Sequence, residues 1–449
     1  MNTIAAIATA TGAGGIGIIR MSGEKCYDVL KKIFMPHDSS FNWNEIKGYT
    51  MKYGYIIDPK TNQKIDEVIV SFFKAPKSYT TENMCEINSH GGMIIERKIL
   101  EQCLLNGADL AEPGEFTKRA FMNGRIDLSQ AESVIDIINA KSDKEVAASF
   151  EQLQGNLSRE IENIRSELLD IMADIEASID YPEYDIEETT NEKAIKLLEH
   201  IKEKLAKLEK SFENGKLLKE GVKTVIVGKP NAGKSSLLNN ILDEERAIVS
   251  DFAGTTRDTI EEFVNIEGVP LKIIDTAGIR NTDDYVEKIG VEKAVHLIKD
   301  ADLVIAIFDN SKELDDEDFK VLELIKNKKC IILLNKCDLS RENAKTQNYM
   351  SKLNKTVIKA SMKTKMGLDE LYNEISKMFS DNEIDLNDGI VITNIRHKNQ
   401  IHKAIERINR YNRTKRVQFT YRYYGNRNKR SAWRSRRDYR EQCFRRYYT

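Results

Sequence analysis

Three patterns of apolar residues follow one another along the 449-residue chain. In the first, short β-branched runs alternate with a helix-like stretch at Glu96–Leu105, and pairs of Gly and Pro punctuate them. The expected strands are Ile16–Met21, Glu67–Phe73 and Met84–Ile87. Strands and helices mixed in this way predict a compact α/β domain over residues 1–118.

From about Phe116 the apolar residues recur at steps of three and four, the period of one face of a helix. A first stripe predicts a single helix of about ten turns that ends near Tyr181 and Pro182. Its members are Val146, Phe150, Leu153, Leu157, Ile161, Ile164, Leu168, Ile171, Ile175 and Ile179. A second stripe predicts another helix over Ile195–Phe212, and the acidic Glu183–Glu192 between the two is expected to be a solvated connection.

Strands and helices alternate again over residues 217–380, and helical character resumes at Leu386–Glu406. The alternation predicts a mostly parallel sheet with helices on both of its faces. Because a helical pattern flanks this module on both sides, we expect it to be inserted into a helical domain made of residues 119–216 and 381–449. The expected fold class is therefore multidomain α/β plus α.

The stretch Gly228–Ser235 reads GKPNAGKS and fits the phosphate-loop pattern GxxxxGK[ST]. The β-branched run Val222–Val227 precedes it and a helix-like run follows, which is the context that the motif needs. The glycines allow backbone N–H groups to turn toward phosphate oxygens. Lys234 supplies a charge for the β- and γ-phosphates, and Ser235 supplies a hydroxyl for Mg²⁺.

Three more segments follow in the order of a guanine-nucleotide-binding domain. Asp275–Gly278 (DTAG), after the strand-like Leu271–Ile274, completes the metal and γ-phosphate site. Asn335–Asp338 (NKCD) follows another apolar run, and the Asp338 carboxylate can accept both N–H donors of the guanine edge, a pair that adenine lacks. Ala360–Met362 lies where the last base-contacting loop is expected. Together the four signals predict a protein that binds and hydrolyses GTP.

Composition favours a soluble globular protein, with 41% hydrophobic and 31% charged residues. No apolar run approaches the ~20 residues that cross a bilayer, and the N-terminus lacks the basic segment of a secretory signal. The six cysteines show neither a CxxC pair nor zinc-site spacing. We therefore expect a cytoplasmic protein with reduced thiols and no membrane contact.

The net charge of −2 conceals an asymmetry. Residues 407–449 hold 13 Arg and 2 Lys against Asp438 and Glu441, and they contain no Leu. This segment therefore carries +13, which leaves −15 for residues 1–406.

Four segments closely resemble the bacterial tRNA-modifying GTPases of the MnmE (TrmE) family. They are GGIGIIR (14–20), SHGG (89–92), PGEFTKRAF (113–121) and NGRIDLSQAE (123–132). The similarity runs from residue 2 to about Glu406, and it implies an N-terminal folate-binding and dimerising domain, a helical-bundle domain and an inserted Ras-like P-loop G domain. The implied function is to add an aminomethyl or carboxymethylaminomethyl group at C5 of the wobble uridine in certain tRNAs. The implied active form is a homodimer that works with a flavin-dependent partner, MnmG (GidA).

Carried over position by position, the resemblance assigns a nucleotide site, two metal sites and a folate site. The implied GTP-binding residues are Asn231, Ala232, Gly233, Lys234, Ser235, Ser236, Ser250, Thr255, Thr256, Asp275, Thr276, Ala277, Gly278, Asn335, Lys336, Asp338 and Ser361. The implied Mg²⁺ ligands are Ser235 and Thr256, and the implied K⁺ ligands are Asn231, Ser250, Phe252 and Thr255. The positions that match contacts to a 5-formyl or 5,10-methylene tetrahydrofolate are Arg20, Glu86 and Arg125. Folate suits them, because its glutamate offers carboxylates to arginines and its pterin edge offers N–H donors to Glu86.

One position bears on the hydrolysis mechanism. Ile279 stands where Ras-type GTPases have the glutamine that positions water. The family instead uses a monovalent cation, placed where an arginine finger's charge would lie, together with a glutamate. Glu287 falls at that glutamate's position, so the resemblance implies that it is the catalytic residue and orients the attacking water.

The C-terminal segment departs from the family, whose members end in Cys-x-Gly-Lys, whereas Cys443 is followed here by FRRYYT. One interpretation is a basic tail for RNA, with Arg for phosphates and Tyr for base stacking. The other is a reading-frame shift near codon 407. We favour the shift, because apolar periodicity stops where the helical bundle should be completed. We then expect the segment after Glu406 to be weakly helical at most, and the chain to bind nucleotide but modify tRNA poorly.

A second functional class also fits the GTPase motifs. An RNA-binding or ribosome-assembly GTPase switch would use them without any modification chemistry. Tight binding of a folate by the N-terminal domain would exclude that class.

Overall fold

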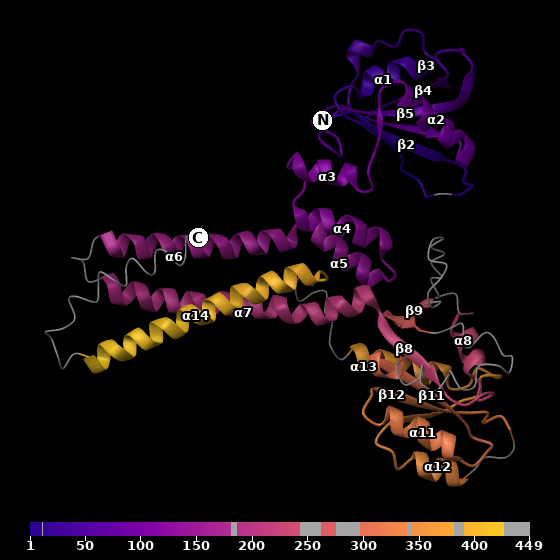
Figure 1. Cartoon of the computed structure of the whole chain (residues 1–449), viewed down its shortest axis with the longest axis vertical. Coiled ribbons are helices and arrows are strands. Elements are labelled where there is room, and N and C mark those ends of the chain that lie inside the picture. The colour runs from indigo at the N-terminus through magenta and orange to yellow at the C-terminus, as the bar shows by residue number, and fades with distance from the viewer. Residues whose placement is uncertain are drawn as a thin grey trace. The chain divides into compact units, whose positions relative to one another are not determined.

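A computed structural model gives the structure of the chain (Figure 1). The structure describes residues 1–10, 12–180, 186–242, 262–274, 297–339, 344–380 and 390–425, without the side chains of residues 178, 179, 186–191 and 415–425. Contacts divide the chain into two units, the first made of Met1–Asn139 and Ser149–Ser158 and the second of the remainder. No helix in the described ranges is both long and apolar enough to span a membrane.

The first unit is built on a seven-stranded sheet with the strand order β3-β4-β5-β6-β2-β1-β7. Its strands are β1 (Ile4–Ile7), β2 (Gly17–Ser22), β3 (Phe34–Pro36), β4 (Thr50–Ile57), β5 (Lys64–Phe73), β6 (Met84–Ser89) and β7 (Asp109–Leu110). All paired neighbours are antiparallel except β1 and β7. The three strands expected from the sequence thus correspond to β2, β5 and β6.

Two helices, α1 (Cys26–Ile33) and α2 (Met93–Leu105), pack against this sheet and against each other. The core between helices and sheet contains Leu30 of α1, Ile99 of α2 and Phe72 of β5. A 3-10 turn, Trp43–Glu45, also adds to it. The expected N-terminal α/β fold is therefore present.

The helical part begins with α3 (Glu115–Met122), α4 (Leu128–Asn139), α5 (Asp143–Leu153) and α6 (Asn156–Asp180). The prediction of one unbroken helix from Val146 to Ile179 is wrong, because the stripe is divided between α5 and α6. Gly155 lies at the division with φ +80°, in the left-handed region that ends a helix.

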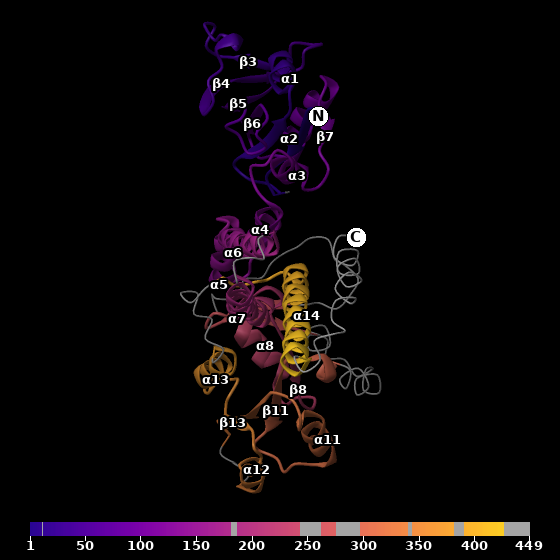
Figure 2. The ribbon, with the colours of Figure 1, turned by 90° about the vertical axis from the view of Figure 1, so that its left-hand side faces the viewer.

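The long helix α7 (Ile186–Glu220) packs along α14 (Ile395–Gly425), and both views show the two side by side (Figures 1 and 2). Their shared core includes Ile201, Leu205 and Ile405. Two predictions are wrong here. Ile186–Glu192 forms the first turns of α7 and is not a loop, and the chain after Glu406 continues as a helix to Gly425. Residues 426–449 lie outside the described part.

The second sheet has six strands in the order β13-β12-β11-β8-β10-β9. The strands are β8 (Val222–Val227), β9 (Glu262–Ile266), β10 (Val269–Ile273), β11 (Leu303–Asp309), β12 (Cys330–Asn335) and β13 (Thr356–Lys359). Every pair is parallel except β9 with β10. The helices are α8 (Lys234–Leu242), α11 (Asp316–Ile325), α12 (Ala344–Met350) and α13 (Leu368–Ser380).

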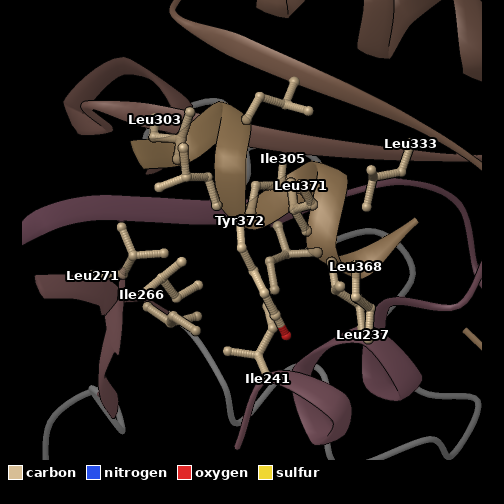
Figure 3. Close-up of a cluster of buried hydrophobic side chains, with 14 of the residues drawn as sticks. Leu237, Ile241, Ile266, Leu271, Leu303, Ile305, Leu333, Leu368, Leu371 and Tyr372 are labelled. Carbon is tan, nitrogen blue, oxygen red and sulfur yellow. The ribbon is translucent and has the colours of Figure 1, made fainter. Parts of the chain in front are cut away.

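Helices cover both faces of this sheet, so there are two cores. Figure 3 shows one core, in which Leu371 and Tyr372 of α13 lie among side chains of α8 and of the sheet. The other contains Leu322 of α11 and Met350 of α12. The predicted parallel sheet inserted between helices is confirmed, and with it the fold class.

Candidate functional site

The phosphate loop Gly228–Ser235 leaves the end of β8 and turns directly into α8. Gly228 has φ +152°, and a Cβ there would collide with the carbonyl oxygen of Ile307 in β11. Gly233 has φ +112°, and a Cβ there would collide with the side-chain amide of Asn335. The two glycines of the motif therefore let the loop pass close to β11 and to the strand that carries the base-reading segment.

Lys234 is the first residue of α8 and lies within the loop. Its Nζ donates to the carbonyl oxygens of Gly228, at 2.7 Å, and Lys229, at 2.8 Å. Burial lowers the pKa of this amine, and a nearby phosphate would favour its charged form again. The first N–H groups of α8 have no acceptor within the helix, so the same place favours an anion through hydrogen bonds and the helix dipole.

Lys229 is a residue of this loop to which the sequence had assigned no role. Its Nζ lies 2.8 Å from an Asp318 carboxylate oxygen and 2.5 Å from one of Asp315. Asp315 caps the N-terminus of α11 in a capping box with Asp318. The Asp-x-x-Asp spacing indicates a helix start, but no local signal shows that this start lies beside the phosphate loop.

The base-reading residues meet the phosphate loop through Asn335. This residue is 3% exposed. Its Nδ2 donates to the Ala232 carbonyl oxygen at 2.7 Å, and its Oδ1 accepts a hydrogen bond from the Met362 N–H at 3.0 Å. Asp338 accepts a hydrogen bond from the Ser361 hydroxyl at 2.7 Å. Three segments far apart in sequence are thus joined at one edge of the sheet.

Lys336 has a positive φ of +68°, and its Nζ lies 2.7 Å from an Asp309 carboxylate oxygen at the end of β11. Asn231 is also in the left-handed region, with φ +62°. Ser235 and Ser236 lie in the first turn of α8.

The remaining nucleotide and metal positions lie outside the described residues. They are Ser250, Phe252, Thr255, Thr256, Asp275, Thr276, Ala277, Gly278 and the expected catalytic Glu287. Within the described ranges, no group of three or more His, Cys, Asp or Glu side chains is arranged to hold a metal ion.

The first unit contains a separate cavity of about 760 Å³, and Arg20, Glu86 and Arg125 all line it. Arg20 and Glu86 face each other on the neighbouring strands β2 and β6. The guanidinium of Arg20 binds one Glu86 oxygen through Nε at 2.9 Å and Nη2 at 2.8 Å. The structure therefore brings the three expected folate residues together and pairs two of them.

Tyr79 contacts both arginines of the cavity. The guanidinium carbons of Arg20 and Arg125 lie 5.7 Å and 4.9 Å from the centre of its ring. Arg125 also donates to the Tyr79 carbonyl oxygen at 2.9 Å, and the Tyr79 hydroxyl is 2.9 Å from that of Thr117. These contacts fix an aromatic surface inside the cavity, to which Phe116 adds a second ring 5.6 Å from Arg20.

Arg119 of α3 joins the helix to the segment that carries Tyr79. Its side chain is 5% exposed, and it lies 2.7 Å from Glu115 and 3.1 Å from Glu82. It also donates to the Asn2 carbonyl oxygen at 2.7 Å. Burial raises the pKa of Glu115, but hydrogen bonds from the Glu112 N–H and from Arg119 outweigh it, so this pKa lies below its usual range.

The lining of the cavity carries a net positive charge. The charged side chains of its lining are Arg20, Lys77, Arg125 and Glu86, a net of +2. Within the described part of the chain, neither Lys77 nor Arg125 forms an ion pair. The lining is therefore a region of net positive charge, which would attract an anionic ligand.

The parallel sheet, phosphate loop and base-reading loop define the class of P-loop guanine-nucleotide-binding proteins. Comparison with known families agrees with this class. A family model described as "GTP-binding protein TrmE N-terminus" matches residues 3–125, and one described as "MnmE helical domain" matches residues 128–425. The second match extends beyond Glu406, as does α14.

Close relatives cover most of the chain. The tRNA modification GTPase MnmE of Acetivibrio thermocellus is 49% identical over 407 residues, which are 91% of this chain and 88% of the relative. Those of Finegoldia magna and Clostridioides difficile are each 50% identical, over 403 and 406 residues, with 90% of this chain and 87% of each relative covered. The chain belongs to the tRNA modification GTPase MnmE family. It is a GTP-hydrolysing enzyme of tRNA modification.

Proposed function

We propose that the chain is a potassium-activated GTPase that adds an aminomethyl or carboxymethylaminomethyl group at C5 of the wobble uridine in certain tRNAs. It would do so in the cytoplasm as a homodimer, together with a flavin-dependent partner of the MnmG (GidA) type. The observation that carries this proposal is the presence, in one chain, of a nucleotide site and a separate cavity with net positive charge.

In the G domain each group has a distinct task. Lys234 and the first N–H groups of α8 bind the phosphates, and Ser235 and Thr256 would hold Mg²⁺, which would offset the negative charge of the phosphates. Asp338, oriented by its hydrogen bond from Ser361, binds the guanine edge. Asn335 keeps the base-reading loop next to the phosphate loop.

Hydrolysis would depend on a monovalent cation and a glutamate. Asn231, Ser250, Phe252 and Thr255 are proposed to hold K⁺ beside the phosphates, where it would stabilise the charge that grows between them. Glu287 is proposed to orient the attacking water. These roles rest on the family resemblance and on the isoleucine that stands in place of the usual glutamine.

The cavity suits a tetrahydrofolate, which supplies a one-carbon unit when it is bound. Arg20 holds the Glu86 carboxylate in place through two hydrogen bonds, and that carboxylate can accept from the N–H donors of a pterin edge. Tyr79 and Phe116 offer aromatic faces to the flat rings. The net positive charge of the lining favours the carboxylates at the glutamate end of a folate.

The test combines a folate titration with a modification assay on the full chain, its flavin-dependent partner and tRNA. Glu86→Gln should weaken 5-formyltetrahydrofolate binding and lower the amount of modified uridine, while GTP turnover stays unchanged. Glu67→Gln, on the adjacent strand β5 and outside the cavity lining, is the matched control. If the parent chain hydrolyses GTP but binds no folate, the folate part of this proposal is wrong.

A further inference from the structure

The cavity of the first unit holds two cations that no carboxylate of the described chain neutralises. They are Lys77, in the segment after β5, and Arg125, in the turn after α3. Arg20 is paired with Glu86, so these two account for the net positive charge of the lining. A ligand with more than one negative charge is needed to balance them.

The charged groups that line the cavity differ in their exposure to solvent. Arg20 and Glu86 lie on strands and are half-buried, whereas Lys77 and Arg125 are exposed. The ring of Tyr79 contacts both arginines, 5.7 Å from one guanidinium carbon and 4.9 Å from the other. A hydrogen-bonding carboxylate therefore lies on the sheet, an aromatic ring lies beside both arginines, and the two cations without a carboxylate partner are exposed to solvent.

A folate has the same order of groups, with a pterin, then a benzoyl ring, then a glutamate. We propose that Lys77 and Arg125 bind the glutamate end of the ligand, an inference that rests on the folate site proposed above. The site thereby selects folates that carry a poly-γ-glutamate tail. Each added glutamate brings one more carboxylate to the exposed side, where it meets cations without having to fit inside the cavity.

The expected effect is modest because the two cations are exposed. Ion pairs at a surface are weak and screened by salt, so each added glutamate that reaches a cation should tighten binding about threefold. A triglutamate should then bind about tenfold tighter than a monoglutamate at low ionic strength. The difference should shrink as salt is added, whereas contacts to the pterin should change little.

The experiment measures the dissociation constants of mono- and triglutamyl 5-formyltetrahydrofolate for the full chain by titration calorimetry at low and high salt. Lys77→Gln should bring triglutamate affinity close to that of the monoglutamate and weaken the monoglutamate less than about threefold. Lys60→Gln makes the same charge change in the exposed turn between β4 and β5, outside the cavity lining, and should change neither constant. Arg125 is less informative, because its loss also removes the contacts to Tyr79.

The outcomes distinguish the tail selection from the folate site on which it rests. If the parent chain binds the monoglutamate but gains nothing from the tail, the tail selection is refuted and the folate site stands. The same holds if Lys77→Gln weakens both ligands equally. If neither folate binds, the folate site and the tail selection fail together.

Discussion

Replacing Asn335 by alanine should loosen the phosphate loop and the base-reading loop at once. The Asn335 side chain is buried and makes two hydrogen bonds that no other described residue duplicates. One goes to the carbonyl oxygen of Ala232, at 2.7 Å, and the other comes from the N–H of Met362, at 3.0 Å. Both of those residues are themselves buried, so water cannot readily replace the lost partner.

The magnitude follows from the two polar groups left without a partner. Each buried unsatisfied group costs about 1–3 kcal/mol, so Asn335→Ala should destabilise the G domain by about 4 kcal/mol. This is a large part of the total for an ordinary domain and corresponds to a fall in Tm of roughly 10 °C. Because the two loops also lose their common restraint, GDP affinity should fall at least about tenfold, or about 1.4 kcal/mol.

The assay is calorimetric unfolding of the full chain with and without GDP, combined with a GDP titration. Asn348→Ala, an exposed asparagine on α12, controls for the loss of an amide that makes no such link. Bound GDP should raise the Tm of the parent and the control more than that of Asn335→Ala, because ligand stabilisation follows affinity. If Asn335→Ala melts and binds GDP as the control does, the two hydrogen bonds do not hold the loops together.

Four further outcomes are expected. GTP turnover should be several-fold faster in K⁺ than in Na⁺ at matched ionic strength; equal rates would exclude a cation in the role of an arginine finger. Glu287→Ala should lower turnover and leave GTP affinity nearly intact, whereas Asp338→Asn should chiefly weaken guanine binding; the parental rate in the first variant would disprove its role. Arg119→Met should lower the free energy of unfolding of the first unit by about 1.5–3 kcal/mol in urea unfolding, because it leaves the half-buried carboxylates of Glu82 and Glu115 without their partner, while the exposed Lys118→Met should cost little. The pKa of Glu115 is lower in the folded chain than in the unfolded chain. The ionised carboxylate therefore stabilises the fold at pH values above the unfolded-state pKa of about 4.3, and this stabilisation is lost as the pH falls through the folded-state pKa. The difference in stability between the parent and Arg119→Met should therefore shrink in acid, and a constant difference would contradict the pairing. A version of the chain with a family-type C-terminus should modify more tRNA than the chain itself, as measured by nucleoside mass spectrometry; equal modification would support a working basic tail.

The parts of the nucleotide site that the sequence predicted are those with local signals. A glycine with positive φ after a buried strand can be read from a motif, and Gly228 and Gly233 occupy such positions. The hydrogen bond from Asn335 to Ala232 spans 103 residues of sequence. No motif predicts this hydrogen bond, because the contact depends on β8 and β12 lying on either side of β11.

The folate residues show the same limit. Arg20 and Glu86 were each expected at the site, but their ion pair depends on the register between β2 and β6.

The apolar pattern also did not predict the division between α5 and α6. Leu153 and Leu157 keep a spacing of four across Gly155, so a short turn left the helical period of the stripe unbroken.

The C-terminal helix shows that the burial of a helix face and the formation of the helix are two different properties. The stripe of aliphatic residues fades after Glu406, and this pattern predicts little helix beyond that residue. Yet Ile408 is buried and Tyr411 packs beside it, so α7 still anchors the first turns beyond that point. Farther on, Arg, Lys and Gln are good helix formers, and extending an existing helix needs no new nucleus. Apolar periodicity therefore reports which face of a helix is buried, whereas helix formation itself also follows from backbone propensity and from an anchored start.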